Sequence, residues 1–384
     1  MKLTGRNHVH TKLNNKIVIL QTLLRHGAMS RQDIAELTKL TPATITNLTA
    51  ELIAEQLLVE CGSVVPAKQR AGRRSVELDV QTNSMYVAGV HVRQDRWEAA
   101  IVNIKGEVIS SRQWPLDGLN WTQLIPEIIQ ELKGFFHENK QYVVYAVGIG
   151  SFGLIRHVTG KVLQPNMGAV PELPLVEELE RHLKLPVYID NNVRAMAQAE
   201  SLYGQGKIAE NFLFVYIGWG IGAGLVLHHE LYRSGATGAG ELGHMTLFPD
   251  GEPCWCGNRG CLEMYASDAV LVKRLKLSGT DDLLKLARDG NTMARAALEE
   301  AGVGIGVALA SYNNIFQIER VIIGGVLALE DLPLVHRVRE EIQSRSFLAR
   351  LHPVEVTVSS LGPNIGTIGA ASLAVDMHFL TLKD

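Results

Sequence analysis

The sequence predicts an N-terminal winged helix-turn-helix of the α+β class, followed by a two-lobed α/β domain. Three short helical patterns and a basic loop between two strand-like segments lie within the first 80 residues. From residue 85 onward, strand and helix patterns alternate in two successive β-rich halves. Three of the four cysteines fall between residues 254 and 261, shortly after a histidine at position 244. These observations indicate a DNA-binding head, a larger ligand-binding body and a metal site.

The composition is that of a globular chain with more than one core. Of its 384 residues, 46% are apolar and 20% are charged, which is typical of soluble domains. The sequence contains no run of 18 apolar residues and no apolar signal segment after Met1, so we expect a cytoplasmic chain with no membrane partner. Residues 1–80 hold 11 Lys and Arg against 7 Asp and Glu. This basic head on an acidic body is expected when the head alone touches nucleic acid.

The head begins with the pattern of a helix-turn-helix. Apolar residues at helical spacing predict a first helix over 15–25. Ser30 is expected to cap a second helix, with Asp33 three residues on as a variant of the capping box, and Thr41 to cap a third that starts at Pro42. The exposed face of the third helix is expected to present small and hydrogen-bonding side chains, as a major-groove reader requires: Ala43, Thr44, Thr46, Asn47 and Thr49. From the helices alone, a protein-interaction module with a polar solvent face remains an alternative.

The segment after these helices favours DNA. Strand-like residues at 59–60 and 76–78 enclose a loop with four positive charges and no acid, carried by Lys68, Arg70, Arg73 and Arg74. A basic loop between two strands behind a recognition helix is the wing of a winged helix, and its charges neutralise phosphates. We therefore expect binding to double-stranded operator DNA by a homodimer or homotetramer, because protein symmetry matches a pseudo-palindromic site.

The body contains two halves of similar pattern, so we predict domains at 1–80 and 81–384. The first lobe is expected at about 81–190 plus the C-terminal helix 365–384, and the second at about 191–364. Strands are predicted at 85–92, 97–104, 107–112, 142–150, 186–190, 212–217, 223–229, 320–323 and 354–359. Helices are predicted at 121–138, 173–183, 193–202, 268–275, 281–288, 295–314 and 365–379. Ligands in such folds bind near the carboxyl ends of the strands.

A metal site is predicted in the second lobe, on the loop from 244 to 261. His244, Cys254, Cys256 and Cys261 supply one imidazole and three thiolates, the ligand set of a closed structural zinc site. We expect one zinc ion per chain, with no open position for catalysis. The alternative is that these are unrelated buried thiols and a surface histidine. Glu241 and Glu263 flank the two ends of this loop.

Two motifs of this region resemble the signature of the ROK family of repressors, open reading frames and kinases. They are Gly-Glu-Leu-Gly-His at 240–244 and Cys-x-Cys-Gly-x-x-Gly-Cys-Leu-Glu at 254–263. The resemblance covers about 85–384 and implies an actin-like, ribonuclease-H-like two-lobed sugar-kinase fold. The head is similar to that of the xylose-repressor and N-acetylglucosamine-repressor branch, which adds Ser30 and Arg31 to the candidate DNA contacts.

The resemblance also implies which chemistry is lost. Kinases of the family have an Asp-x-Gly-Gly-Thr hairpin for ATP phosphates, where this chain has residues 91–96, His-Val-Arg-Gln-Asp-Arg. They carry a catalytic aspartate where this chain has Asn192, and an amide cannot take a proton from a hydroxyl. We therefore predict that the chain is not an enzyme. The alternative is an ATP-dependent sugar kinase with an appended DNA-binding head.

The sugar-facing positions implied by the resemblance are better preserved: Asn166, Asn191, Asn192, Glu241, His244 and Glu263. Each has a structural alternative. Asn166 can simply hold a turn, Asn191 or Asn192 can cap a helix, and the two glutamates can be solvated surface acids. We expect a transcriptional repressor of carbohydrate-metabolism genes that a sugar or sugar phosphate releases from its operator.

Overall fold

The computed structural model describes residues 8–64, 75–116, 121–163, 174–234 and 239–382. The chain divides into two compact units. The first unit comprises 1–149, 175–189 and 370–384, and the second comprises 150–174 and 190–369. The boundary at residue 80 and the two lobe boundaries from the sequence remain predictions.

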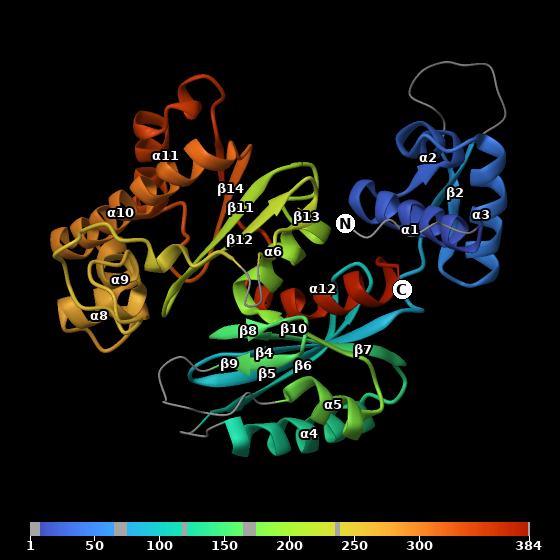
Figure 1. Cartoon of the computed structure of the whole chain (residues 1–384), viewed down its shortest axis with the longest axis horizontal. Helices are drawn as coiled ribbons and strands as arrows, with labels where there is room; N and C mark the ends of the chain where they lie inside the picture. Colours follow the sequence, from blue (N-terminus) through green and yellow to red (C-terminus); the bar gives the residue numbers. More distant parts are fainter. Residues whose placement is uncertain (1–7, 65–74, 117–120, 164–173, 235–238, 383–384) are drawn as a thin grey trace. The chain divides into compact units, whose positions relative to one another are not determined.

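A helix-turn-helix with a small sheet opens the first unit (Figure 1). Its elements are α1 (His8–His26), β1 (Met29–Ser30), α2 (Arg31–Thr38), α3 (Pro42–Ala54), β2 (Leu58–Val64) and β3 (Ser75–Val80), with strand order β1-β3-β2. Ser30 and Asp33 form the predicted capping box at the start of α2. The Thr41 hydroxyl accepts from the Thr44 N–H at 3.2 Å, and Pro42 occupies the first turn of α3. These local signals were sufficient to place both helices.

The rest of the first unit is a five-stranded sheet in the order β10-β7-β4-β5-β6. The strands are β4 (Tyr86–Val92), β5 (Arg96–Asn103), β6 (Val108–Pro115), β7 (Val144–Ser151) and β10 (Val187–Asn191). Helices α4 (Trp121–Glu138) and α5 (Leu175–Leu183) lie on one face, and α12 (Ile365–Phe379) lies on the other (Figure 1). The approach of α12 is close: a Cβ at Gly148 would lie 1.8 Å from the Ala370 carbonyl oxygen, so only glycine fits there.

The second unit has a five-stranded sheet in the order β13-β12-β11-β14-β15. The strands are β11 (Phe212–Ile217), β12 (Ile221–Leu227), β13 (Glu230–Leu231), β14 (Arg320–Gly324) and β15 (Glu355–Val358). Because side chains alternate along a strand, Phe212 and Phe214 pack on one face against α6 (Asn192–Tyr203). Leu213 and Val215 pack on the other face within a second apolar cluster.

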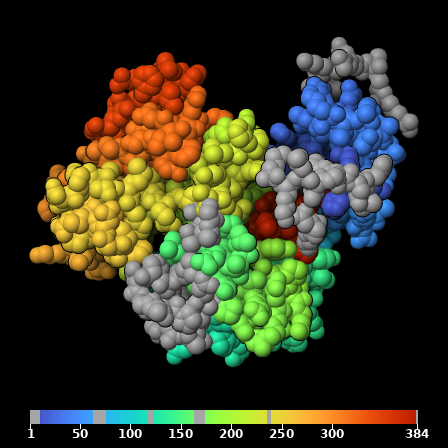
Figure 2. Space-filling model, viewed as in Figure 1, coloured from blue at the N-terminus to red at the C-terminus, as the bar shows by residue number. Residues whose placement is uncertain are grey.

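Helices cover that other face. They are α7 (Glu263–Ala266), α8 (Asp268–Leu275), α9 (Thr280–Arg288), α10 (Thr292–Phe316) and α11 (Pro333–Arg345), and α8 to α11 form one continuous body in the space-filling view (Figure 2). The unit also contains the hairpin of β8 (Leu154–Arg156) and β9 (Lys161–Leu163) and two short 3-10 turns, η1 (Leu242–His244) and η2 (Leu348–Arg350).

The two five-stranded sheets repeat one topology. In each, three antiparallel strands come first along the chain, and the two later strands are added beside the first strand, giving the order 5-4-1-2-3. This confirms the prediction of two β-rich halves in tandem. Helix α11 and the β8–β9 hairpin were not predicted. Across the described ranges, no helix is both long and apolar enough to span a membrane.

Candidate functional site

The structure brings the four predicted metal ligands together. One donor atom from each of His244, Cys254, Cys256 and Cys261 lies within 4.8 Å of the others. The loop that carries them is tightly folded: Gly260 has φ +66°, and a Cβ there would lie 1.6 Å from the Phe248 carbonyl oxygen. The sequence thus places glycine where the loop needs both a left-handed backbone and a close approach.

The distances fit a tetrahedral zinc ion. Sulfur atoms bound to one zinc at ~2.3 Å lie about 3.8 Å apart at the corners of a tetrahedron. Cys256 and Cys261 Sγ are 3.7 Å apart, and Cys254 Sγ is 3.6 Å from His244 Nδ1. Burial and the neighbouring thiols raise the pKa of Cys261 to about 12, so a cation is needed to hold it as a thiolate. The residues therefore fit the ion that the sequence predicts.

Glu263 connects this loop to the start of β12. One carboxylate oxygen accepts a hydrogen bond from Trp255 Nε1 at 2.6 Å, and the other accepts from the Ile221 N–H at 3.0 Å. The Trp255 ring also meets the His244 ring edge-on at 4.7 Å between centroids. Glu263 therefore links the metal loop to β12, and it is also a sugar-site candidate. Glu241 is exposed, directly before η1.

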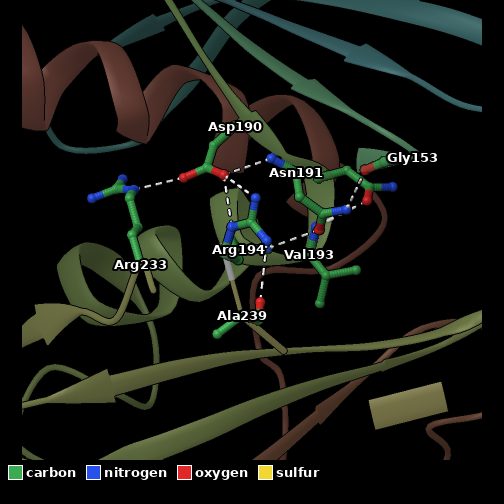
Figure 3. Close-up of polar contacts among 8 residues, drawn as sticks. Gly153, Asp190, Asn191, Val193, Arg194, Arg233 and Ala239 are labelled. Atoms are coloured by element: carbon green, nitrogen blue, oxygen red, sulfur yellow. Dashed lines mark hydrogen bonds and ion pairs between the residues drawn. The ribbon is translucent and has the colours of Figure 1, made fainter. Parts of the chain in front are cut away.

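The two asparagines lie where β10 meets α6: Asn191 is the last residue of β10 and the N-cap of α6, and Asn192 is the first residue of α6. The Asn191 side-chain oxygen caps the helix, accepting from the Val193 N–H at 2.9 Å, and its Nδ2 donates to the Gly153 carbonyl at 3.3 Å (Figure 3). The Asn192 oxygen also accepts from Val193, at 3.0 Å. The capping alternative thus holds for Asn191, while its position at the carboxyl end of a strand also suits ligand contact.

A buried ion cluster that sequence reasoning missed lies beside these asparagines. Asp190, 1% exposed, accepts from Arg194 Nε at 2.7 Å and from Arg233 Nε at 2.6 Å (Figure 3). Although burial opposes it, the two arginines lower the pKa of Asp190. A signal for half of the cluster was present, since Asp190 and Arg194 have i,i+4 spacing. Arg233 lies 43 positions away and had no such signal.

Ion pairs between neighbouring side chains connect the residues of the turn between β4 and β5. Arg96 Nε donates to Glu98 at 2.6 Å, and its terminal nitrogen contacts Asp95 at 2.8 Å. Asp95 also pairs with Arg93 at 3.3 Å. Burial opposes ionisation of Glu98, but His91 and Arg96 hold its pKa at about 2. The positive charges of this turn are therefore matched by carboxylates.

The DNA-contact candidates on the helices differ in what they already bind. Ser30 is buried in its capping box, and Arg31 donates to Thr49 at 3.1 Å and to Glu60 at 3.0 Å. Thr44 bonds Thr41 at 2.9 Å and Thr46 bonds the Pro42 carbonyl at 2.8 Å, whereas Ala43 and Asn47 are exposed. The placement of Thr49 on the exposed face was wrong: its side chain is buried, and its hydroxyl donates to the Ile45 carbonyl at 2.8 Å. Asn166, Lys68, Arg70, Arg73 and Arg74 lie outside the described residues.

This combination defines a class of protein: a helix-turn-helix head joined to a duplicated, kinase-like α/β body with a His-Cys₃ loop. A sequence model of the ROK family matches residues 87–377, and the chain belongs to the ROK family. It is 31% identical to the xylose repressor of Caldicellulosiruptor bescii, across 96% of this chain and 97% of that protein.

Solved structures agree with this family and with its fold. A ROK family transcriptional regulator, described as a homologue of the E. coli MLC protein, superposes with a TM-score of 0.80 at 26% identity, across 96% of both chains. The ROK hexokinase of Thermus thermophilus superposes with a TM-score of 0.62 at 26% identity, across 75% of this chain and 97% of that one. The fold is thus the two-lobed ROK fold, which regulators and kinases share.

Proposed function

We propose that this chain is a DNA-binding transcriptional repressor of carbohydrate-metabolism genes, acting in the cytoplasm and released from its operator by a sugar or sugar phosphate. The observation that carries the proposal is the head: a capped α3 that exposes Ala43 and Asn47, on a body of the ROK family. The full-length similarity to a protein named xylose repressor supports it. The basic segment 66–74 would act as the wing and contact phosphates.

In this proposal the body binds sugar without phosphorylating it. Asn192 stands at the start of α6 where a general base would be needed, and an amide can donate to or accept from a hydroxyl but cannot deprotonate it. The β4–β5 turn presents side chains paired among themselves, with none of the glycines that let backbone N–H groups approach a phosphate.

The sugar site would be built around the metal loop. A zinc ion held by Cys254, Cys256, Cys261 and His244 Nδ1 would serve a structural role and leave the other ring nitrogen of His244 for a hydroxyl group. Glu241, exposed beside it, would accept from a second hydroxyl. Asn166, Asn191, Asn192 and Glu263 complete the proposed contacts. Several such bonds are needed because each unpaired hydroxyl costs about 1–3 kcal/mol on burial.

Release from DNA follows if the sugar binds one conformation of a homodimer or homotetramer better than the other. A differential affinity of a few kcal/mol would shift the population away from the spacing of recognition helices that matches the two half-sites. No contact between sugar and DNA is required.

The test is a mobility-shift titration of the full-length protein on the DNA upstream of its own gene, with a panel of pentoses, hexoses and their phosphates. We expect one sugar or sugar phosphate to release the DNA. If no compound changes operator affinity, the sensor proposal is wrong. A coupled ADP-release assay on the same panel addresses the kinase: sugar-dependent turnover at ordinary kinase rates, on the order of 1–100 per second, would overturn the proposal.

For the head, we expect Asn47→Ala to weaken specific operator binding by roughly 1–3 kcal/mol while leaving binding to random DNA nearly unchanged, because an exposed amide on α3 reads base edges. The contrasting variant is Arg73→Ala, which should weaken binding to both DNAs and flatten the salt dependence by about one counterion. Fluorescence anisotropy across a salt series measures both. Equal loss on specific and random DNA for Asn47→Ala would remove its assigned role.

A further inference from the structure

The ion cluster at Asp190 carries more positive charge than it neutralises. All its members lie in the second unit. One buried carboxylate is shared by two guanidinium groups, Arg194 and Arg233. Since arginine is always protonated in proteins, the cluster has a formal charge of +1. A partly buried charge is costly unless it is paired. The excess positive charge of this cluster therefore calls for an anionic partner.

Arg194 is the cation that Asp190 compensates. Its side chain is 2% exposed, and its Nε and a terminal nitrogen both lie 2.7 Å from Asp190 Oδ1. Its other terminal nitrogen donates to the Ala239 carbonyl oxygen at 3.1 Å. Arg194 is therefore held inside the fold, with its donors directed to protein oxygens.

Asp190 holds Arg233 through the Nε edge of its guanidinium group. Its Nε contacts Asp190 Oδ2 at 2.6 Å, and its side chain is 21% exposed. Figure 3 shows its terminal nitrogens on the far side of the guanidinium from Asp190, and within the described part of the chain they contact no acceptor. Two parallel N–H donors of a guanidinium match two oxygens of a phosphate or carboxylate. Asp190 thus orients the Arg233 guanidinium so that its two terminal nitrogens can donate to a ligand.

His157 lies within the field of the same cluster. It follows β8 in the β8–β9 hairpin, and its Nδ1 is buried without a partner among the residues that the structure describes. Burial lowers the pKa of His157, Asp190 opposes this, and the two arginines add to the lowering. A neutral imidazole here has one ring N–H to donate, and a bound anion would accept it.

The cluster adjoins the proposed sugar site along the chain. Asp190 directly precedes Asn191, and Arg194 bonds the carbonyl of Ala239, two positions before Glu241. A ligand contacted by Asn191 and Glu241 would therefore lie near the residues that orient Arg233.

We propose that Arg233, supported by His157, binds an anionic substituent of the effector, so that the chain senses a sugar phosphate or a sugar acid in preference to a neutral sugar. This rests on the proposed sugar-sensing function. It explains why Asp190 meets two arginines where one would balance its charge. The terminal nitrogens of Arg233 would supply the bidentate contact to the anion. Arg194 keeps Asp190 in place, and Asp190 in turn orients Arg233.

The experiment is isothermal titration of the full-length protein with matched neutral and anionic sugars: glucose, glucose 6-phosphate and glucuronate, and N-acetylglucosamine with its 6-phosphate, with further parents added from the mobility-shift panel. We expect one anionic member to bind at least about 10-fold tighter than its neutral parent, with affinity that falls as salt rises. The phosphate and carboxylate arms identify which anion is recognised.

Variants then assign the effect to Arg233. Arg233→Gln leaves Asp190 and Arg194 as a balanced pair and should lose roughly 10- to 100-fold in affinity for the anionic sugar, without change for its neutral parent. Arg233→Lys should recover part of the loss, since it keeps the charge but not the two parallel donors. The matched control is Arg288→Gln, an exposed arginine paired with Asp331, which should change neither.

The outcomes separate the two proposals. A neutral sugar that binds as tightly as its anionic forms, or an anion preference that survives Arg233→Gln, overturns this inference and leaves the sensor function standing. If no sugar of either charge binds while operator DNA is still bound, the sensor function fails and this inference fails with it. If Arg233→Gln does not fold, Arg233→Lys decides the assignment: an anion preference as strong as that of the wild type overturns the inference, because lysine lacks the two parallel donors.

Discussion

Cys256→Ser is expected to abolish stoichiometric zinc binding and to lower the free energy of unfolding of the second unit by more than about 4 kcal/mol. The reason is that a closed four-ligand site contributes its binding energy to folding, and serine does not supply a thiolate. Cys256 is the best position for the test because its side chain is exposed, whereas Cys254 and Cys261 are buried. Its replacement therefore removes a ligand without opening a cavity. Elemental analysis and thermal melting measure the two effects.

The matched control is Cys61→Ser, since Cys61 is a free thiol in β2 of the first unit and is not one of the four metal-ligand candidates. It should keep one zinc per chain and melt close to the wild type. Inducer response should also fail in Cys256→Ser, because His244 and the Trp255–Glu263 contact depend on the loop. A Cys256→Ser protein that retains one zinc and melts like the wild type would contradict the structural metal site.

The elements that the sequence predicted best are those specified locally. Ser30 with Asp33, and Thr41 with Pro42, satisfy helix N-termini within a few residues, and the structure forms both caps. Helix α11 was missed although Pro333, Leu334 and Val338 carry a start signal and helical spacing. Its first turn follows a stretch without a polar cap, since the N-cap residue is Leu332. A helix whose stability comes from packing on α10 has a weaker signal in its own sequence.

In the candidate site too, the locally specified residues were predictable and the contacts between distant positions were not. The metal ligands were predictable because three of them fall within eight positions, and their chemistry identifies the ion. The bonds of Glu263 to Ile221 and of Arg233 to Asp190 join positions 42 and 43 residues apart. Which carboxylate oxygen faces which donor depends on how β12, α6 and the loops of the second unit pack. A single sequence contains no periodicity that reports such a pairing.

The second large effect is expected from Asp190→Asn, which should destabilise the protein by roughly 3–5 kcal/mol. Asp190 is 1% exposed, and its two oxygens accept from Arg194, Arg233 and the Asn191 N–H. An asparagine would leave a buried guanidinium unpaired and would turn one acceptor into an NH₂ group facing a donor. Thermal and urea unfolding of the full-length protein measure the loss. Asp331→Asn is the control, because its pair with Arg288 is exposed to solvent and should contribute little to stability.

The pH dependence of this loss has a definite sign. The arginines lower the pKa of Asp190 below its unfolded value, so its contribution is fully present above about pH 4 and is lost as the pH falls through the lower folded-state pKa. The stability difference between wild type and Asp190→Asn should therefore be constant near neutral pH and narrow below about pH 4. A difference that widens with acid would show that Asp190 is not held ionised by its partners.

A double-mutant cycle separates the ion pair from simple packing. Once Asp190 is neutral, Arg194 is a buried charge without a counter-ion, so adding Arg194→Met should cost much less than Arg194→Met alone and can restore stability. The coupling between the two changes should reach roughly 2 kcal/mol or more. Additive losses would mean that Arg194 gains its stability from Ala239 and the surrounding apolar contacts. Strong coupling would establish that Asp190 and Arg194 form one closed pair, which is the condition that leaves the charge of Arg233 for another partner.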